Sequence, residues 1–178
     1  TLTEAIEANA TRTFYAHWPE PPSGKIYGET ANDDGLAQFK NRLNKPFDGL
    51  LQQGSDGTVG EEQSPYGFPL GITYPTWSAD TLAANANQAQ KQWSRLSPAD
   101  RAAVCIELLE RAAAHFFEIG YATMHTTGQG FVMAFQASGP HAFDRALEAV
   151  AMGYAATTYF DYSQTWTKPM GKISVTLE

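Results

Sequence analysis

The sequence predicts a mainly α-helical fold with a long irregular segment and minor β content. Apolar residues recur at spacings of three and four between Ser97 and Gln129, which is the period of an amphipathic helix. The same period appears over residues 78–96 and 141–159. Residues 49–77, in contrast, are rich in glycine and proline and cannot sustain a helix.

Length, composition and charge restrict the class of protein. The chain has 178 residues, 43% of them hydrophobic and 17% charged, a balance typical of a globular domain with its own core. The net charge is -7, which disfavours a sequence-independent grip on nucleic-acid phosphates. Charges interrupt the longest apolar runs, so no membrane span is expected. We therefore predict a single domain over residues 1–178, located in the cytoplasm, with neither nucleic acid nor a membrane as partner.

Residues 1–77 are expected to hold helices followed by the irregular segment. A first helix is predicted from Thr1 to about His17, because apolar residues keep the helical spacing and the acidic residues come early. Residues 18–28 contain three prolines, which exclude a helix there. A short helix is predicted over about Gly35–Asn44, before Pro46 ends it.

The irregular segment, residues 49–77, is predicted to form turns and two short strands. The strands are expected around Val59 and over Leu70–Thr73. Segments of this length without regular structure are usually functional or lie against another part of the molecule. A phosphate-binding loop needs a strand before it and a helix after it, so we interpret the glycines of this segment as turn residues: Gly54, Gly57 and Gly60.

Residues 78–160 are predicted to form a helical bundle. Ser78 and Ser97 are expected as N-cap residues of two helices. The connection between these helices is short, which predicts an antiparallel pair, and Gly120 is expected to weaken the second helix or break it. Three predicted helices begin at Ser78, Ser97 and His141, and each has an apolar stripe that is expected to face the core. The residues of these stripes are Leu82, Ala86, Ala89, Trp93, Val104, Cys105, Leu108, Leu109, Ala112, Phe116, Ile119, Phe143, Leu147, Val150, Ala151 and Tyr154.

Residues 161–178 are predicted to be a solvated connection followed by a strand. The strand is expected over Ile173–Leu177, where apolar and polar residues alternate. A lone strand leaves its backbone donors and acceptors without partners. We therefore expect this chain to be a cut piece of a longer protein.

Cys105 is the one cysteine of the chain. A single sulfur allows neither an intramolecular disulfide nor a zinc site built from thiolates. Its neighbours Val104 and Ile106 place it on an apolar helix face, whereas a reactive thiolate needs an accessible and electropositive setting. We interpret Cys105 as a packed side chain and assign it no catalytic role.

The other residues with catalytic or metal-binding chemistry form no convincing constellation. No two histidines stand four residues apart, and the zinc-protease motif is missing, so no metal site is predicted. Ser138, His141 and Asp144 could be imagined as a triad, but no nucleophile-elbow pattern surrounds Ser138. We interpret Ser138 as a turn residue and Asp144 as the partner of a surface Lys or Arg.

Several longer strings carry a family resemblance. The stretch from Ser78 to Gln129 has an alanine-rich helix ending in Trp93, a helix start with Arg101, and a Thr-Gly pair at Thr127 and Gly128. In this pattern it resembles the N-terminal helical part of the aldehyde dehydrogenase superfamily, which has an α/β fold. Within the superfamily the chain resembles the phenylacetic acid degradation protein N group, through GKIYGE, VGEEQSPYGFPLGITYP, MHTTGQ, AFQASGPHAFDRALEAVA and KPMGK.

The resemblance implies an enzyme that oxidises an aldehyde of phenylacetate degradation with NAD or NADP. In that family a cysteine attacks the aldehyde, hydride passes to the cofactor, and a glutamate-activated water releases the acid. The resemblance places all these parts beyond the end of this sequence, so it implies an N-terminal fragment with no catalytic, cofactor-binding or metal-binding residues of its own. Such a fragment is expected to be inactive alone, with the remainder of the dehydrogenase chain as partner and homo-oligomers as the assembly.

Two alternatives remain open from the sequence. The resemblance implies that the last helix borders the substrate tunnel, and by position Phe143 and Leu147 are predicted to face it; the alternative is that both are core residues. For the whole chain, the alternative to a dehydrogenase fragment is a non-enzymatic helical module for protein interaction or oligomerisation, whose apolar face meets a partner or a second copy.

Overall fold

The structure is a computed structural model that describes residues 1–52, 54–161 and 164–177. It is mainly helical with minor strand content, as the sequence predicted. Within the described ranges, no helix is both long enough and apolar enough to cross a bilayer. The elements in chain order are α1 (Leu2–Thr11), α2 (Gly24–Tyr27), α3 (Ala31–Arg42), β1 (Gly57–Val59), β2 (Gln63–Ser64), β3 (Phe68–Pro69), β4 (Tyr74–Thr76), α4 (Ala79–Trp93), α5 (Pro98–Ala113), α6 (Phe116–Thr127), α7 (Phe131–Ser138), α8 (Pro140–Thr157), β5 (Trp166–Met170) and β6 (Ile173–Leu177).

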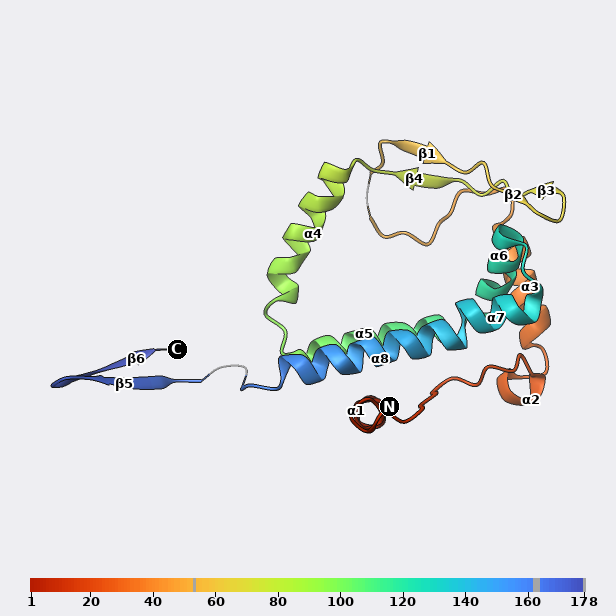
Figure 1. Ribbon diagram of the computed structural model, residues 1–178. Coiled ribbons are helices and arrows are strands. Elements are labelled where there is room, and N and C mark those ends of the chain that lie inside the picture. Colours follow the sequence, from red (N-terminus) through yellow and green to blue (C-terminus); the bar gives the residue numbers. More distant parts are fainter. Residues whose placement is uncertain (53, 162–163, 178) are drawn as a thin grey trace.

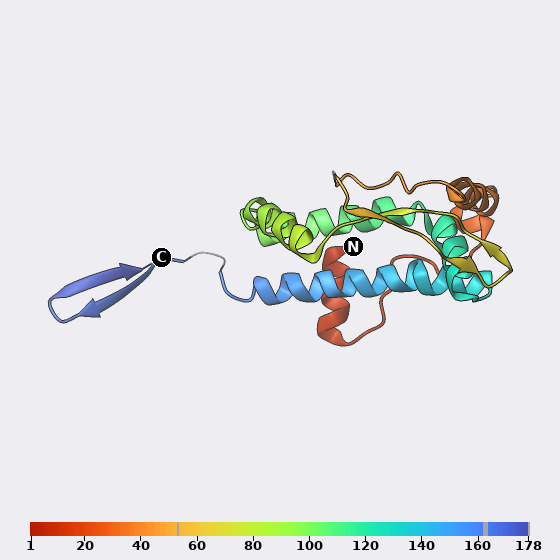
Figure 2. The ribbon, with the colours of Figure 1, turned by 90° about the horizontal axis from the view of Figure 1, so that it is seen from above.

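The helices form an open frame. Figure 1 shows α5 and α8 side by side, with α3, α6 and α7 closing one end and α4 rising alone from the other. The two-stranded antiparallel sheet of β1 and β4 lies across the far side of the frame. The hairpin of β5 and β6 projects away from the end of α8, which Figure 2 shows from above.

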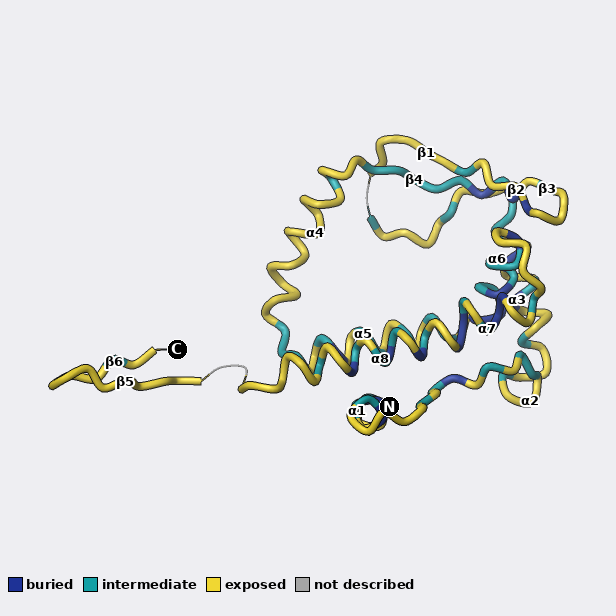
Figure 3. The backbone as a smooth tube through the Cα atoms, viewed as in Figure 1, coloured by how far each residue is buried: buried dark blue, intermediate teal, exposed yellow. Residues whose placement is uncertain are grey.

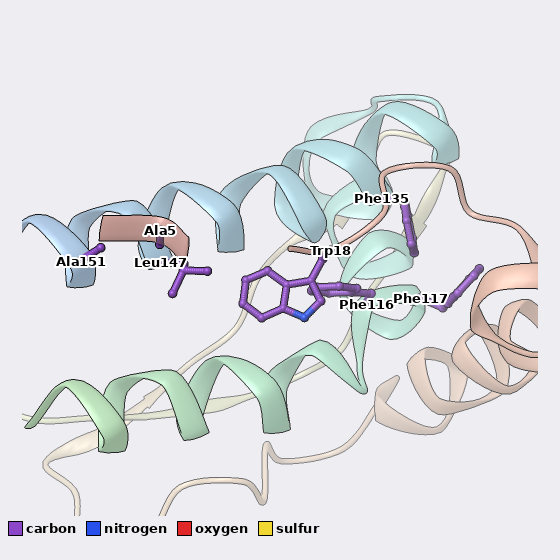
Figure 4. Packing of buried hydrophobic residues seen from close by; sticks show 7 residues of the cluster. All are labelled: Ala5, Trp18, Phe116, Phe117, Phe135, Leu147 and Ala151. Carbon is purple, nitrogen blue, oxygen red and sulfur yellow. The ribbon is translucent and has the colours of Figure 1, made fainter. Parts of the chain in front are cut away.

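The core sits where α5, α6, α7 and α8 meet. Phe135 is 0% exposed and Phe116 is 1% exposed, and the two rings meet edge to face at 6.1 Å. Trp18, from the segment after α1, contacts Phe116 edge to face at 6.3 Å, and Figure 4 shows its indole between the helices. Edge-to-face pairs add to the free energy gained from apolar burial. A second, smaller cluster joins α3 to the irregular segment through Phe39, Leu70 and Ile72.

The predicted helix over 97–129 is two helices. Ser97 caps the first as expected, because its Oγ accepts the Asp100 N–H at 3.1 Å. The chain then turns at Ala114 and His115, which lets Phe116 and its neighbour Phe117 both point into the core. The expected break at Gly120 is wrong.

Gly120 lies inside α6 and brings α7 close to it. A Cβ there would lie 3.1 Å from the Cα of Phe135, which is tighter than ordinary packing. The absence of a side chain at Gly120 therefore permits the approach of the two helices, and the residue has a packing role instead of ending the helix.

The predicted antiparallel pairing of the helices from Ser78 and Ser97 is wrong. Ser78 does cap α4, since its Oγ accepts the Thr81 N–H at 3.2 Å. However, each residue of α4 is exposed or only partly buried, and the helix leads away from α5 (Figure 3). The reason is that α8 packs on α5, where Ala102 is buried. The inward positions predicted for α4 and for Val104 and Leu108 are therefore wrong.

Several shorter elements differ from the prediction. The first helix ends at Thr11, because Arg12 takes a left-handed conformation, and the helix excluded from residues 18–28 exists as the four-residue α2. The strand near Val59 is confirmed, whereas Leu70–Thr73 is not a strand: its apolar side chains pack on Phe39. The strand Ile173–Leu177 is confirmed, but it pairs with β5 in the stretch predicted as a connection.

Candidate functional site

An uncovered apolar surface is the candidate functional site of this chain. The chain exposes 12244 Å², whereas a folded monomeric protein of 19.4 kDa exposes about 8,500 Å². The excess is about 3,700 Å², compared with about 800 Å² that each partner contributes to a standard protein interface. The chain therefore exposes surface that a self-contained domain of this size buries.

Two helices, α4 and α5, carry part of this surface, and we use the name helical face for their exposed apolar residues. It consists of Leu82 and Trp93 on α4, which are 45% and 38% exposed, and Val104 and Leu108 on α5, which are 50% and 66% exposed. Both α4 residues belong to the stripe that the sequence predicted to point inward. An amphipathic helix whose apolar stripe is uncovered is a typical docking element.

The second part is one face of the hairpin formed by β5 and β6, which we call the arm face. The register pairs Trp166 with Leu177, and Met170 with Ile173, so all four apolar side chains share a face with the Lys168–Val175 pair. Each of the four is more than half exposed. The opposite face carries Thr167, Pro169, Ser174 and Thr176. A two-stranded hairpin is marginal alone, so the arm needs a cover over its apolar face.

Asp144 fixes the N-terminal segment on α8 and thereby shapes the frame. Its Oδ1 accepts the backbone N–H of His17 at 2.8 Å and that of Trp18 at 3.4 Å. The carboxylate is only 6% exposed, so the predicted surface pairing with Lys or Arg is wrong. The sequence did carry a signal: Asp144 stands three residues before Leu147, on the inward stripe of the helix.

Two tyrosines beside this segment have raised pKa values. Burial, followed by the hydrogen bond to Glu4, raises the pKa of Tyr15 to about 12. Burial also raises the pKa of Tyr27 to about 12, with a smaller contribution from the charge of Asp144. Both phenols are therefore neutral at physiological pH and act as structural hydrogen-bond donors.

The residues of the imagined triad each interact with other groups. Ser138 Oγ donates to the Ala134 carbonyl at 2.6 Å, and His141 lies 3.7 Å from Glu20. Asp144, the third residue, is occupied by the backbone amides described above.

The four histidines and the cysteine have separate surroundings. His17 bonds to Glu110, His115 to Glu118, and His125 to Ser64. In the described part of the chain, no three His, Cys, Asp or Glu side chains are grouped so as to hold a metal ion. Cys105 is partly buried and lines a shallow groove between α5 and α8 with Tyr154.

The two residues predicted to face a substrate tunnel are packed inside this chain. Leu147 is 1% exposed and belongs to the main cluster. Phe143 is partly buried and meets Phe116 edge to face at 4.9 Å. In the described residues Leu147 is therefore part of the core and Phe143 packs against it. The prediction that they face a substrate tunnel stays a prediction.

The described residues thus form a helical layer with two uncovered apolar faces. No family model matches the chain, and no curated protein matches it. A crystal structure of an NAD-dependent aldehyde dehydrogenase from Burkholderia multivorans is similar to it, with 45% sequence identity and a TM-score of 0.89. The match covers 98% of this chain and 31% of that chain. This chain thus spans about a third of that protein, and the similarity supports the aldehyde dehydrogenase superfamily.

Proposed function

We propose that this chain is the helical part of an NAD-dependent aldehyde dehydrogenase that acts in phenylacetate degradation, and that it is inactive alone. The observation that carries the proposal is the excess exposed area of about 3,700 Å², together with a fold that matches 31% of a dehydrogenase chain. The helical face then receives the remainder of the dehydrogenase chain. The finer substrate class follows from the sequence strings that resemble the phenylacetic acid degradation protein N group.

The described residues do not fit a nicotinamide cofactor. A dinucleotide site uses a parallel strand, a glycine turn and a helix N-terminus. The sheets of the described residues are two-stranded and antiparallel, and Gly57 opens a strand of one of them. We therefore assign NAD, together with the catalytic cysteine and general-base glutamate, to the remainder of the enzyme. The contribution of this chain is to support and enclose that part.

An oligomerisation role is a second function, and the arm face favours it. The arm projects from the body in both Figure 1 and Figure 2, and its apolar residues are beyond the reach of the main cluster. A second copy of the enzyme is the proposed cover. An Ile173→Asp variant of the complete enzyme should dissociate to smaller species in sedimentation, whereas Ser174→Asp on the opposite face should not. Equal assembly of both variants would contradict this role.

The proposed activity is tested on the natural product that carries these residues. An antibody against residues 1–178 isolates it from its source cell, and its intact mass and its formation of NADH with aldehydes are measured. The proposal predicts a mass far above 19.4 kDa and NADH formation by the isolated protein but not by the 178-residue chain. A natural product of 19.4 kDa would contradict it and leave the non-enzymatic module.

A further inference from the structure

A buried histidine joins the irregular segment to the helical body. His125, near the end of α6, is 9% exposed, and its Nδ1 lies 2.9 Å from the Oγ of Ser64 in β2. Ser64 is 4% exposed. Because both groups are covered, substrate cannot reach them, and the pair is not a nucleophile with its base. The contact instead connects residues 61 positions apart in the chain.

Aromatic rings enclose the imidazole. Phe39 of α3 stacks on it at 4.8 Å, with an angle of 2° between the planes. Tyr66 and Phe68, from the turn that follows Ser64, meet it edge to face at 5.4 Å and 5.1 Å. Among the described residues, the ring and hydrogen-bond contacts given for His125 include no carboxylate. Among these described contacts Tyr66 is the ionisable residue, and Tyr121, on the same helix as His125, packs against the cluster that contains Phe39.

The hydrogen bonds around Ser64 suit a neutral ring. Ser64 Oγ already accepts the Tyr66 N–H at 3.1 Å, so its own proton is available for Nδ1. The Tyr66 hydroxyl in turn donates to the Gln129 carbonyl at 3.1 Å, beyond the end of α6. A protonated ring would carry a hydrogen at Nδ1 that Ser64 Oγ could accept, but the Ser64 hydroxyl hydrogen would lose Nδ1 as its acceptor.

We propose that the Ser64–His125 pair is a pH-sensitive latch, which holds the turn over residues 64–68 on the end of α6 near neutral pH and releases it in mild acid. The charged ring would lie between aromatic side chains without a counter-ion, and its free energy would be lower in water. Release lets the imidazolium reach water and detaches Tyr66 from Gln129. This inference concerns residues of this chain alone and does not depend on the dehydrogenase proposal.

The direction of the pH dependence follows from burial. Desolvation lowers the pKa of His125 from its ordinary value of 6.5. A depressed histidine pKa gives stability that is complete above the unfolded value. That stability is lost as the pH falls from about 6.5 toward the pKa of the folded state.

Hydrogen exchange tests the latch in the natural chain that carries residues 1–178. The reporters are the amides of Tyr66, Gly67 and Leu70, which donate to Ser64 and Glu62. Their protection factors should fall severalfold, and by no more than about tenfold, between about pH 7.5 and about pH 5.5, which is the limit for one histidine with an unfolded pKa of about 6.5. His125→Phe should abolish this dependence, whereas His141→Gln, at an exposed position, should retain it. Unchanged protection in the wild type, or an equal fall in His125→Phe, would overturn the latch.

An NMR titration keeps the test decisive if His125→Phe does not fold. The imidazole resonances of His125 in the wild type report its protonation directly, and the amide resonances of the turn report release. Both should change with the same midpoint. Ser64→Ala removes the donor that favours the neutral ring, so it should move this midpoint upward. A turn that changes at a pH where His125 does not titrate would overturn the proposal.

Discussion

The closed corner of the molecule and its open wing differ in what covers their apolar residues. At the corner, α6, α7 and the start of α8 bury Phe116 and Phe135 almost completely. In the wing, formed by α4 and the hairpin, comparable apolar residues are exposed (Figure 3). Both regions have well-formed helices or strands with good caps and register, so local sequence signals fold each of them. The difference teaches that burial here depends on which layers are present in the chain.

The largest loss of stability is expected for a substitution in the corner. Phe135→Ala leaves a cavity at a site that is 0% exposed, and it should lower the free energy of unfolding by about 3–5 kcal/mol. Leu108→Ala, at a site 66% exposed, should change it by less than about 0.5 kcal/mol. Denaturant midpoints of the two variants measure both values. Equal losses would mean that the exposed side of α5 is as well packed as the corner.

The next effect concerns the attachment of the N-terminal segment. Asp144→Ala leaves the amides of His17 and Trp18 without their acceptor. The expected cost is about 2–3 kcal/mol, because buried unpaired donors keep their desolvation penalty. The control is Asp48→Ala, whose ion pair with Arg42 is exposed and should contribute less than about 1 kcal/mol. Hydrogen exchange over residues 13–20 should rise in the first variant and stay unchanged in the second.

A pair of helical glycines sharpens the contrast with effects of opposite sign. At Gly35 in α3, a Cβ would overlap the Cβ of Phe117 and lie 2.8 Å from its backbone carbon. Gly35→Ala should therefore cost about 1–2 kcal/mol. At Gly153 in α8, a Cβ would meet nothing within 4 Å, and Gly153→Ala should stabilise by about 0.5–1 kcal/mol. The melting temperatures of the two variants measure these effects. A lower melting temperature for Gly153→Ala would contradict the open space found around this residue.

The smallest effect is expected on the helical face. Trp93→Ala in the 178-residue chain should change the free energy of unfolding by less than about 0.5 kcal/mol, because α4 has little to pack against. In the complete enzyme the same substitution should cost about 3 kcal/mol or more, as for a buried aromatic residue. Lys91→Ala is the matched control, and it should be neutral in both. A large loss in the isolated chain would contradict the open wing.

Much of the local structure could be predicted from sequence, because local signals decide it. Ser78 and Ser97 predicted two helix starts, and the side chains of both accept the expected capping hydrogen bonds. The alternation over Ile173–Leu177 predicted β6. The partners of these elements could not be predicted in the same way. Periodicity shows that Leu82 and Leu108 lie on apolar stripes, but it does not state whether the covering layer belongs to this chain.

The parts of the site that sequence missed depend on contacts between distant residues. Asp144 was read as a surface residue, yet it accepts amides from a segment 127 positions away. The sequence predicts no metal site for the histidines and gives no other role to His125, yet Ser64 and the rings of Phe39, Tyr66 and Phe68 enclose it. The assignments of Phe143 and Leu147 to a tunnel remain predictions, because the wall opposite them would come from outside these residues.

The most direct test of the central claim is hydrogen exchange of α4 in two settings. The amides of α4 are compared between the 178-residue chain alone and the complete natural protein that contains it. If the helical face receives the remainder of a dehydrogenase, protection of α4 should be low in the isolated chain and at least about tenfold higher in the complete protein. Low protection in both settings would contradict the account, because the apolar stripe of α4 would then have no cover in the working protein.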